Sequence, residues 1–322
     1  MAMAPFLLEA RGLTVTYGNG VRAVADVDLT VSRGEIVGLV GESGCGKSSL
    51  ANTVLRLVKP DSGGLLFDGM DLLGASKDEL RAIRKRLQVV PQDPSTSLNP
   101  RLTIAQSVEF NLKVHRWGRG ERGRRVAEML DRVGIPAAYS NRYPHQLSGG
   151  QLQRVAIARA LATDPDLVVC DEAVSALDKS VQAQILNLLS ELQRDLDVAF
   201  LFVSHDLTVV EHISDRVMVM YLGRIVEEGP ASDILQSPQH PYTQALLASI
   251  PTRGQRRAVI HGEPPSPVDP PSGCGFRTRC PHAAEVCASY DNTPVPVTPA
   301  HDARCIRLEE LALTHPQLWR TP

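Results

Sequence analysis

A glycine-rich segment near the start of the chain has the residue types and spacing needed to bind phosphate. Residues 41–48 read Gly-Glu-Ser-Gly-Cys-Gly-Lys-Ser, which satisfies the pattern GxxxxGK followed by serine or threonine. In such a loop the backbone N–H groups surround the phosphates, and the next helix directs its positive end toward the same anion. We expect Lys47 to contact the β- and γ-phosphates and the Ser48 hydroxyl to ligate Mg²⁺. Cys45 lies inside the loop and reads as a structural filler rather than a redox switch.

A second candidate site is a run of apolar residues that ends in two carboxylates. Residues 167–172 read Leu-Val-Val-Cys-Asp-Glu, the pattern of a buried strand with acidic side chains at its end. Phosphoryl transfer needs neutralisation of charge by a metal ion and an oriented nucleophile. Paired with the phosphate loop, Asp171 is therefore a candidate for the Mg²⁺ shell and Glu172 for the attacking water. By itself, the same run would also suit the end of a surface strand.

The elements around these motifs are those of an α/β protein. Residues 36–40 are a buried-strand signal, and the pattern turns helical from Ser48. Continuous apolar runs at 167–170 and 199–203 flank a helical segment at 181–195. This alternation predicts a mainly parallel sheet covered by helices. Further segments are two strands at 6–17 and 22–31 expected to pair antiparallel, a strand at 87–90, mostly helical residues 104–163, and a helix-turn stretch at 231–249.

Composition and charge narrow the class of protein. The chain has 322 residues and a net charge of −2, so no general basic field indicates nucleic acid as a partner. No apolar stretch reaches the ~18 residues that would suggest a membrane-spanning helix. The first residues lack the pattern of a secretory signal. We therefore expect a cytoplasmic protein that serves any membrane process by docking onto another subunit.

The cysteines are concentrated near the end of the chain, after a proline-dense linker at 262–272. Their spacing is Cys274-x5-Cys280-x6-Cys287-x17-Cys305. Four thiolates suit a tetrahedral Zn²⁺ ion or a 4Fe–4S cluster, and the spacing alone does not decide between these and unmetallated thiols. His282 and His301 are possible substitute ligands. Nothing in the sequence places this module near the phosphate loop, so we expect a structural or regulatory role.

The segment at 147–151, Leu-Ser-Gly-Gly-Gln, resembles the signature of the ATP-binding-cassette (ABC) ATPases. Around it, Tyr17 resembles the residue that stacks on adenine, Gln92 the Q-loop glutamine, and His205 the switch histidine. Asp178 lies in a segment that resembles the family's D-loop. The resemblance covers about residues 6–235. The implied fold is a P-loop NTPase with a RecA-like core, an antiparallel β subdomain and a helical subdomain at about 93–163.

The resemblance implies a role for each matching residue. Glu172, His205, Gln92 and Lys47 are the catalytic set, and Ser48, Gln92 and Asp171 hold Mg²⁺. Ser148, Gly149, Gly150 and Gln151 would bind the ATP held by a partner cassette, with Asp178 linking the two sites. The residues expected to contact ATP are Tyr17, Gly41, Ser43, Gly44, Cys45, Gly46, Lys47, Ser48 and Ser49.

Three further segments resemble the ATPase subunits of dipeptide and oligopeptide importers. They are residues 91–101, 143–151 and 240–247, and the tail at 274–287 agrees with them. Such importers usually combine two different ATPase subunits, two transmembrane permeases and an extracytoplasmic binding protein, and this chain looks closer to the second ATPase subunit. The resemblance implies a nucleotide-binding domain at 1–235, an extension at 236–322, and a place on the cytoplasmic face of the membrane. Nickel importers share this architecture.

The resemblance also bears on the cysteines and on rival functions. Members of the peptide-importer group carry an iron–sulfur cluster at this tail, which implies 4Fe–4S at Cys274, Cys280, Cys287 and Cys305, with Zn²⁺ as the alternative. ABC ATPases of translation usually hold two cassettes in one chain, and those of DNA repair carry long coiled-coil insertions. Neither feature is present here. A P-loop kinase would not need the signature segment, and a GTPase would need a guanine-reading motif.

Overall fold

The computed structural model describes residues 5–250 and 262–311, and the chain folds into two compact units. The first unit comprises Met1–Leu8, Thr30–Ile36 and Leu66–Val203, and the second comprises Glu9–Leu29, Val37–Leu65 and Ser204–Pro322. Parts of the expected divisions 1–235 and 236–322 therefore lie outside the described residues, at 1–4, 251–261 and 312–322. Among the helices described, none has the length and hydropathy to cross a membrane.

Three parallel strands form the core of the first unit. The middle strand, β7, pairs with β6 from Leu87 opposite Leu167, and with β8 up to Asp171 opposite Val203. All residues of β8 and the first four of β7 are buried, as their continuous apolar sequences predict. The elements of this unit are β5 (Met70–Asp71), α2 (Lys77–Arg86), β6 (Leu87–Val90), α3 (Pro94–Ser97), α4 (Ile104–Val114), α5 (Arg119–Arg132), α6 (Gly149–Leu161), β7 (Leu167–Asp171), α7 (Lys179–Leu196) and β8 (Ala199–Ser204).

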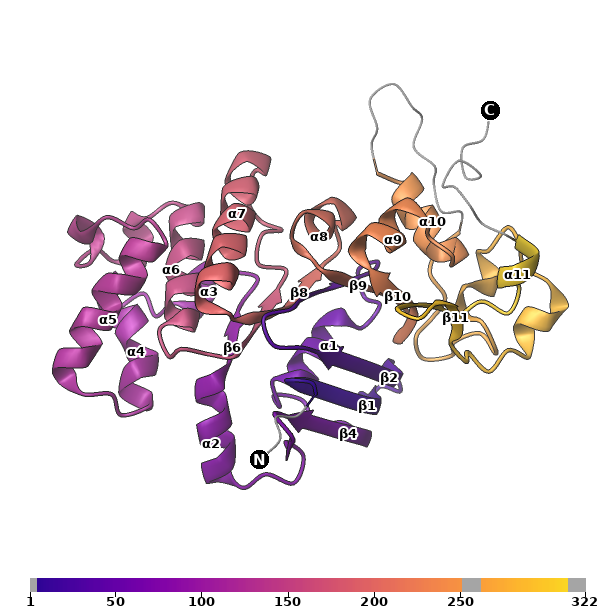
Figure 1. Ribbon diagram of the computed structural model, residues 1–322, viewed down its shortest axis with the longest axis horizontal. Helices are drawn as coiled ribbons and strands as arrows, with labels where there is room; N and C mark the ends of the chain where they lie inside the picture. The colour runs from indigo at the N-terminus through magenta and orange to yellow at the C-terminus, as the bar shows by residue number, and fades with distance from the viewer. Residues whose placement is uncertain (1–4, 251–261, 312–322) are drawn as a thin grey trace. The chain divides into compact units, whose positions relative to one another are not determined.

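The helices α4, α5 and α6 pack against one another, as Figure 1 shows, and form the expected helical part of the unit. Their boundaries follow from local chemistry. Thr103 with Gln106 and Ser148 with Gln151 make reciprocal capping boxes at the starts of α4 and α6. Buried residues on each helix face its neighbours, among them Val108, Met129 and Val155.

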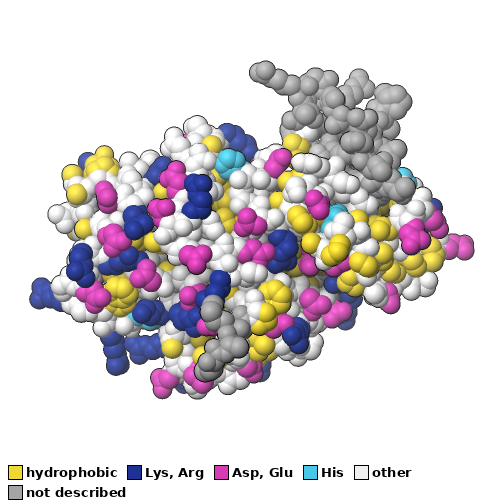
Figure 2. All heavy atoms as spheres, viewed as in Figure 1, with side chains coloured by type: hydrophobic (Ala, Val, Ile, Leu, Met, Phe, Trp, Pro, Cys, Tyr) yellow, Lys and Arg dark blue, Asp and Glu magenta, His cyan; other side chains and the backbone are white. Residues whose placement is uncertain are grey.

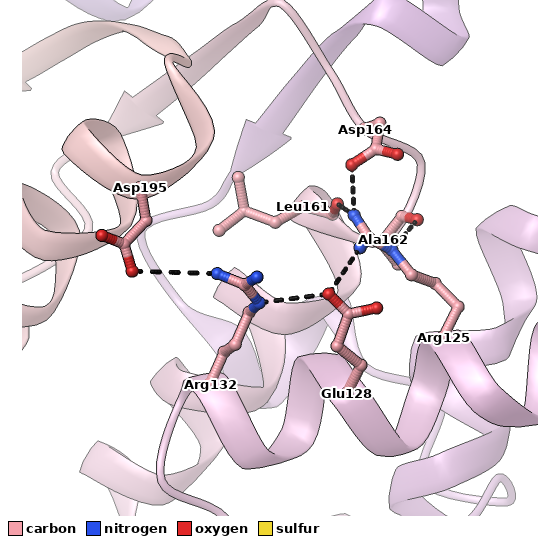
Figure 3. A network of polar contacts seen from close by, with 7 residues as sticks. All are labelled: Arg125, Glu128, Arg132, Leu161, Ala162, Asp164 and Asp195. Carbon is pink, nitrogen blue, oxygen red and sulfur yellow. Dashed lines mark hydrogen bonds and ion pairs between the residues drawn. The ribbon is translucent and has the colours of Figure 1, made fainter.

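An ionic network anchors α5 to the C-terminal end of α6 (Figure 3). Arg125 donates hydrogen bonds to the carbonyl oxygens of Leu161 and Ala162 and pairs with Asp164. Placing a cation on the last carbonyls of a helix complements the helix dipole. Glu128 bridges Arg125 and Arg132 on the same helix. The side chain of Arg125 is only 11% exposed, so its bonds to the helix carbonyls are partly shielded, whereas its carboxylate partner Asp164 is exposed.

A second set of ion pairs joins four segments of the first unit that are far apart in the chain. Asp68 pairs with both Arg33 and Arg86, and Asp166 pairs with the same two arginines. The members lie before β3 (Ile36–Val40), after β4 (Ser62–Phe67), at the end of α2 and before β7. Because every charge has two opposite partners, the set fixes these connections together.

The second unit contains the other strands and the C-terminal module. Its strand order is β11-β12-β10-β9-β3, in which β3 and β9 pair parallel and the remaining pairs are antiparallel. A separate sheet has the order β2-β1-β4. The elements are β1 (Leu8–Thr16), β2 (Arg22–Val31), β3 (Ile36–Val40), α1 (Lys47–Val54), β4 (Ser62–Phe67), α8 (Leu207–Ile213), β9 (Arg216–Tyr221), β10 (Arg224–Pro230), α9 (Ala231–Gln236), α10 (Pro241–Ala248), β11 (Val295–Thr298), β12 (His301–Ala303) and α11 (Leu308–Leu311).

The expected helix-turn stretch at 231–249 consists of α9 and α10. Proline at the first position of α10 suits a helix start, because its missing N–H has no partner there. The preceding His240 is buried, and its Nδ1 accepts a hydrogen bond from the Tyr242 N–H, which caps the helix. Burial lowers the pKa of His240 to about 3, so this ring is neutral at physiological pH.

Charged side chains of both signs are interspersed on the face drawn in Figure 2. The chain has 34 basic and 36 acidic residues in all.

Candidate functional site

The phosphate loop joins β3 to α1, in the strand–loop–helix arrangement that the motif requires. Gly46 precedes α1 with φ of 111°, and a Cβ at this residue would lie 1.9 Å from the carbonyl oxygen of Ala23. Only glycine therefore fits this turn. No side chain caps the first turn of α1. Its backbone N–H groups remain directed toward the loop, where they suit an anion.

Lys47 lies beneath this loop. Its side chain is buried, and Nζ donates hydrogen bonds to the carbonyl oxygens of Gly41 and Glu42, both at 2.9 Å. The next residue, Ser48, is exposed. Cys45 is buried beside Lys47, and burial raises the pKa of its thiol. A neutral, inaccessible thiol agrees with the interpretation of Cys45 as a filler.

Tyr17 presents an exposed ring on the same unit. The side chain is 40% exposed, unusual for a large aromatic residue, and its hydroxyl donates to Ser49 Oγ at 3.1 Å. The bond orients the ring relative to the first turn of α1. An exposed, oriented aromatic face is suited to stacking on a planar base.

Two of the predicted catalytic residues come together at the carboxyl end of β7. Gln92 Nε2 donates to Glu172 Oε2 at 3.1 Å, although the residues are 80 positions apart. Glu172 has φ of 47°, a left-handed conformation that is uncommon for a residue with a side chain. Its backbone N–H is held by the Val203 carbonyl at 3.0 Å. Such strained residues concentrate at functional sites because the surrounding structure must hold them.

His205 directly follows β8 and is exposed. The next residue, Asp206, accepts a hydrogen bond from the Thr208 N–H and so fixes the start of α8. The histidine is thus placed in a short, well-defined turn between a buried strand and a helix.

The signature residues form the start of α6. Ser148 Oγ accepts from the Gln151 N–H, and Gln151 Oε1 accepts from the Ser148 N–H at 3.0 Å. Gly150 packs against α7, where a Cβ would lie 2.5 Å from the Val181 side chain. Asp178 caps α7 by accepting from the N–H groups of Ser180 and Val181. Sequence reasoning assigned Asp178 a role at an interface, and its local role as a helix cap was missed.

The four cysteines of the C-terminal module line one small cavity, together with His240 and His282. Burial raises the pKa of Cys280 to about 12 and that of Cys305 to about 11, and it also raises the pKa of Cys274. Among the described residues, no group of three or more His, Cys, Asp or Glu side chains is spaced to hold a metal ion. His301 is not available as a substitute ligand because its Nε2 contacts the buried Glu227 carboxylate at 2.8 Å.

The structure corrects one expectation about this module. We expected nothing to place it near the phosphate loop, yet Arg279, which lies between two of the cysteines, forms an ion pair with Glu42 of that loop. The pair spans 237 positions in the chain. No spacing rule in the sequence could have revealed it, because either residue alone reads as an exposed charge.

The fold and these motifs define the class, an ATPase of the ATP-binding-cassette type. Residues 24–175 match the family model for ABC transporters, and residues 226–287 match the C-terminal region of oligopeptide/dipeptide transporters. The chain is 47% identical to the oligopeptide transport ATP-binding protein AppF of Bacillus subtilis, over 88% of this chain and 89% of that protein. It is 46% identical to OppF of Escherichia coli, over 90% of this chain and 89% of OppF.

Solved structures agree with the sequence relatives. CbiO1 of Clostridium perfringens, part of a cbiONQ transporter complex, superposes with a TM-score of 0.67 at 30% identity, covering 72% of this chain and 91% of CbiO1. The dimeric, ADP- and phosphate-bound cassette MJ0796 gives 0.64 at 32% identity, covering 70% and 98%. The chain belongs to the ABC transporter ATP-binding proteins that carry the oligopeptide/dipeptide transporter C-terminal region.

Proposed function

We propose that this chain binds and hydrolyses ATP to drive the import of peptides through separate permease subunits. Its relatives include proteins named for oligopeptide transport, and they match the chain along nearly their whole length. The observation that carries the proposal is the phosphate loop, in which Lys47 lies against two loop carbonyls at the open N-terminus of α1. Such a loop has the geometry and charge to hold the phosphates of a nucleotide.

Each predicted residue then has a chemical role. Adenine stacks on Tyr17, and the phosphates lie in the loop at 41–49 with Lys47 against the β- and γ-phosphates. Ser48, Asp171 and Gln92 would hold Mg²⁺, which would neutralise the charge that develops on the transferred phosphoryl group. Glu172 accepts a proton from the attacking water, and its orientation is supported by Gln92. His205 contacts the γ-phosphate.

A second cassette completes the site. The start of α6 at Ser148, Gly149 and Gly150 offers backbone N–H groups and a positive helix end to the γ-phosphate held by the partner. Gln151 fixes this start through the capping box, and Asp178 fixes the neighbouring start of α7. ATP binding then favours the dimer, and hydrolysis favours its separation. The dimeric structures of the cassette MJ0796 support the pairing of two cassettes.

Coupling to transport begins at Gln92. The segment that follows contains α3, whose Ser97 carbonyl accepts a hydrogen bond at 2.8 Å from Arg159 of α6. Arg159 is half-buried, so this hydrogen bond between α6 and the segment after Gln92 is partly shielded from solvent. Loss of the γ-phosphate changes the contacts of Gln92, and this link carries the change to α6. A permease helix pressing on residues 92–101 would sense the movement.

We also propose a specific set of partner subunits. The chain works with two permeases, a second and different ATPase subunit, and an extracytoplasmic binding protein that delivers the peptide. It docks on the cytoplasmic face of the membrane.

We further propose that Cys274, Cys280, Cys287 and Cys305 hold a 4Fe–4S cluster. All four line one cavity, and backbone groups of His282 and Arg307 hydrogen-bond the sulfurs of Cys280 and Cys305. Such bonds stabilise thiolates, whose charge a metal cluster would neutralise. Within the described residues no group of three or more His, Cys, Asp or Glu side chains is spaced to hold a metal ion, so the shared cavity is the observation that supports the proposal. Iron and zinc analysis of the purified chain, with its visible absorption spectrum, tests the choice.

A first experiment tests ATP hydrolysis through Glu172→Gln. The amide cannot accept a proton, so turnover should fall by about a hundredfold or more, while ATP binding and ATP-dependent dimerisation persist. The measurements are phosphate release, and light scattering after gel filtration with and without MgATP. Lys47→Ala should lose both binding and dimerisation. Hydrolysis by Glu172→Gln at the parental rate would contradict the role of this residue.

A second experiment tests the transported substrate. Tagged chain is purified from gently solubilised membranes, its partners are identified, and the complex is reconstituted in vesicles with its binding protein. Uptake of a labelled tripeptide that depends on ATP and on Lys47 supports peptide import. Uptake of Ni²⁺ without peptide uptake would assign the complex to metal import and overturn that part of the proposal.

A further inference from the structure

Arg279 of the C-terminal module donates two hydrogen bonds to the carboxylate of Glu42 in the phosphate loop. Nη1 lies 2.8 Å from Glu42 Oε2, and Nη2 lies 3.2 Å from Oε1. The Arg279 side chain is only 5% exposed, and that of Glu42 is 26% exposed. A two-pronged arginine–carboxylate pair with this burial is stronger and more directional than a surface ion pair.

The backbone of Glu42 is held from both sides as well. Its N–H donates to the Tyr242 hydroxyl at 2.9 Å, and its carbonyl oxygen accepts from Lys47 Nζ at 2.9 Å. Glu42 therefore lies between the C-terminal region, through Arg279 and Tyr242, and the lysine of the phosphate loop.

Aromatic packing holds the module in this position. Phe276, three residues before Arg279, is almost fully buried and packs against Tyr221 and Tyr242, with ring centroids 5.4 and 5.3 Å apart. Arg279 Nη1 also lies 3.3 Å from the Tyr221 hydroxyl. Burial opposes the charge on Arg279, but its bonds to Glu42 and Tyr221 raise the pKa of the guanidinium overall. The group is therefore a fixed positive charge.

We propose that Arg279 is a positioning residue for nucleotide binding, through which the cysteine-bearing module holds the phosphate loop in its binding conformation. This inference rests on the proposed ATP site at 41–48 and adds to it a residue from a distant part of the chain. Because the loop is already held in place, less conformational entropy is lost when ATP binds.

The balance of charge at the phosphate loop predicts how variants of Arg279 and Glu42 should bind ATP. ATP brings several negative charges to a loop that already carries the carboxylate of Glu42. Arg279 neutralises that carboxylate, and its removal would leave an uncompensated charge beside the phosphates. Removing Glu42 as well should relieve the repulsion. A residue that served only the fold of the module would give no such recovery.

The test uses calorimetric binding of MgATP to the full chain, with Glu172→Gln present throughout to prevent hydrolysis. We expect Arg279→Gln to weaken binding by about tenfold. The double variant E42Q/R279Q should recover only the part of that loss that the uncompensated Glu42 carboxylate causes, because it also lacks the pair that holds the loop. Arg277→Gln is the matched control, because Arg277 lies in the same module but donates to Ser272 rather than to the loop. It should bind MgATP as the parent does.

Arg279→Lys is a second test, to be used if Arg279→Gln fails to fold. Lysine keeps the charge but cannot form two parallel bonds, so its affinity should fall between those of the parent and Arg279→Gln. Thermal melting reports folding in each case. Parental affinity in a folded Arg279→Gln would overturn the positioning role. Parental affinity in the double variant would also overturn it, because the pair would then act through charge alone. If the parent itself does not bind MgATP, the proposed ATP site fails, and the inference fails with it.

Discussion

At the scale of single residues, the predicted chemistry depends on side chains whose conformations are set by close neighbours. Glu172 adopts an uncommon backbone conformation at the end of β7, and Gln92 hydrogen-bonds its carboxylate. Tyr17 is similarly oriented by Ser49 while its ring stays exposed. In Tyr17 the hydrogen bond holds the hydroxyl and leaves the face of the ring exposed for a ligand.

Tyr17 gives a prediction at this scale. Replacement by alanine removes the ring and should weaken ATP binding by ~1–3 kcal/mol, the usual contribution of an aromatic side chain stacked on a base. Replacement by phenylalanine removes only the hydroxyl bond to Ser49 and should retain most of the affinity. Calorimetric titration of both variants with MgATP makes the comparison. Equal losses in the two variants would show that the hydroxyl, and not stacking, is the important group.

At the scale of elements, buried polar links join segments that must act together. Arg159 ties α6 to the Q-loop segment, and Arg125 ties α5 to the end of α6. The ion pairs among Arg33, Asp68 and Arg86 fix the connections around the first unit's sheet. Such links tie the helices of the first unit to one another and to the segment that follows Gln92.

Asp68 gives a prediction about pH. Its hydrogen bond from Arg86, more than the one from Arg33, lowers the pKa of the carboxyl below the ordinary value. The folded state therefore favours the ionised form, and this stabilisation is present above about pH 4 and is lost as the pH falls through the lowered pKa. Asp68→Asn should reduce stability by about 1–2 kcal/mol at pH 7 and by progressively less below pH 4. Urea unfolding of both proteins across this range measures the difference, and a constant difference would contradict the assignment.

At the scale of the whole molecule, the C-terminal module is connected to nucleotide chemistry through Glu42 and Arg279. If a metal cluster holds the module together, then loss of the cluster should weaken ATP binding at the phosphate loop. The connection is short, because Arg279 is the direct neighbour of Cys280.

Cys280→Ser tests this connection. The variant should lose iron and should bind MgATP more weakly than the parent, because Arg279 is no longer held beside Glu42. Iron content, visible absorption and calorimetric ATP binding are measured on the same preparation. Loss of iron with unchanged ATP affinity would separate the cluster from the nucleotide site. Retention of iron would remove Cys280 from the ligand set.

The local structure of the phosphate loop could be predicted from the sequence because its parts are consecutive in the chain. The phosphate loop is eight consecutive residues, and its glycines and lysine have fixed roles once a strand precedes it and a helix follows it. The strands at 36–40, 87–90 and 199–204 were predicted to within a residue, because continuous apolar runs bounded by turns identify buried strands. The capping roles of Ser148 and Asp178 are equally local, and were available from the residue pattern.

The tertiary structure alone decided which distant residues meet. Gln92 reaches Glu172, Arg159 reaches Ser97, and Arg279 reaches Glu42 only because the fold brings separate segments together. Single charges and amides carry no periodicity, so their sequence context reads as solvent-exposed surface. Their partners are chosen by packing, as when Phe276 packs against both Tyr221 and Tyr242 and brings Arg279 to the phosphate loop. The sequence by itself determined the chemistry of the site, and three-dimensional packing determined what holds that chemistry in place.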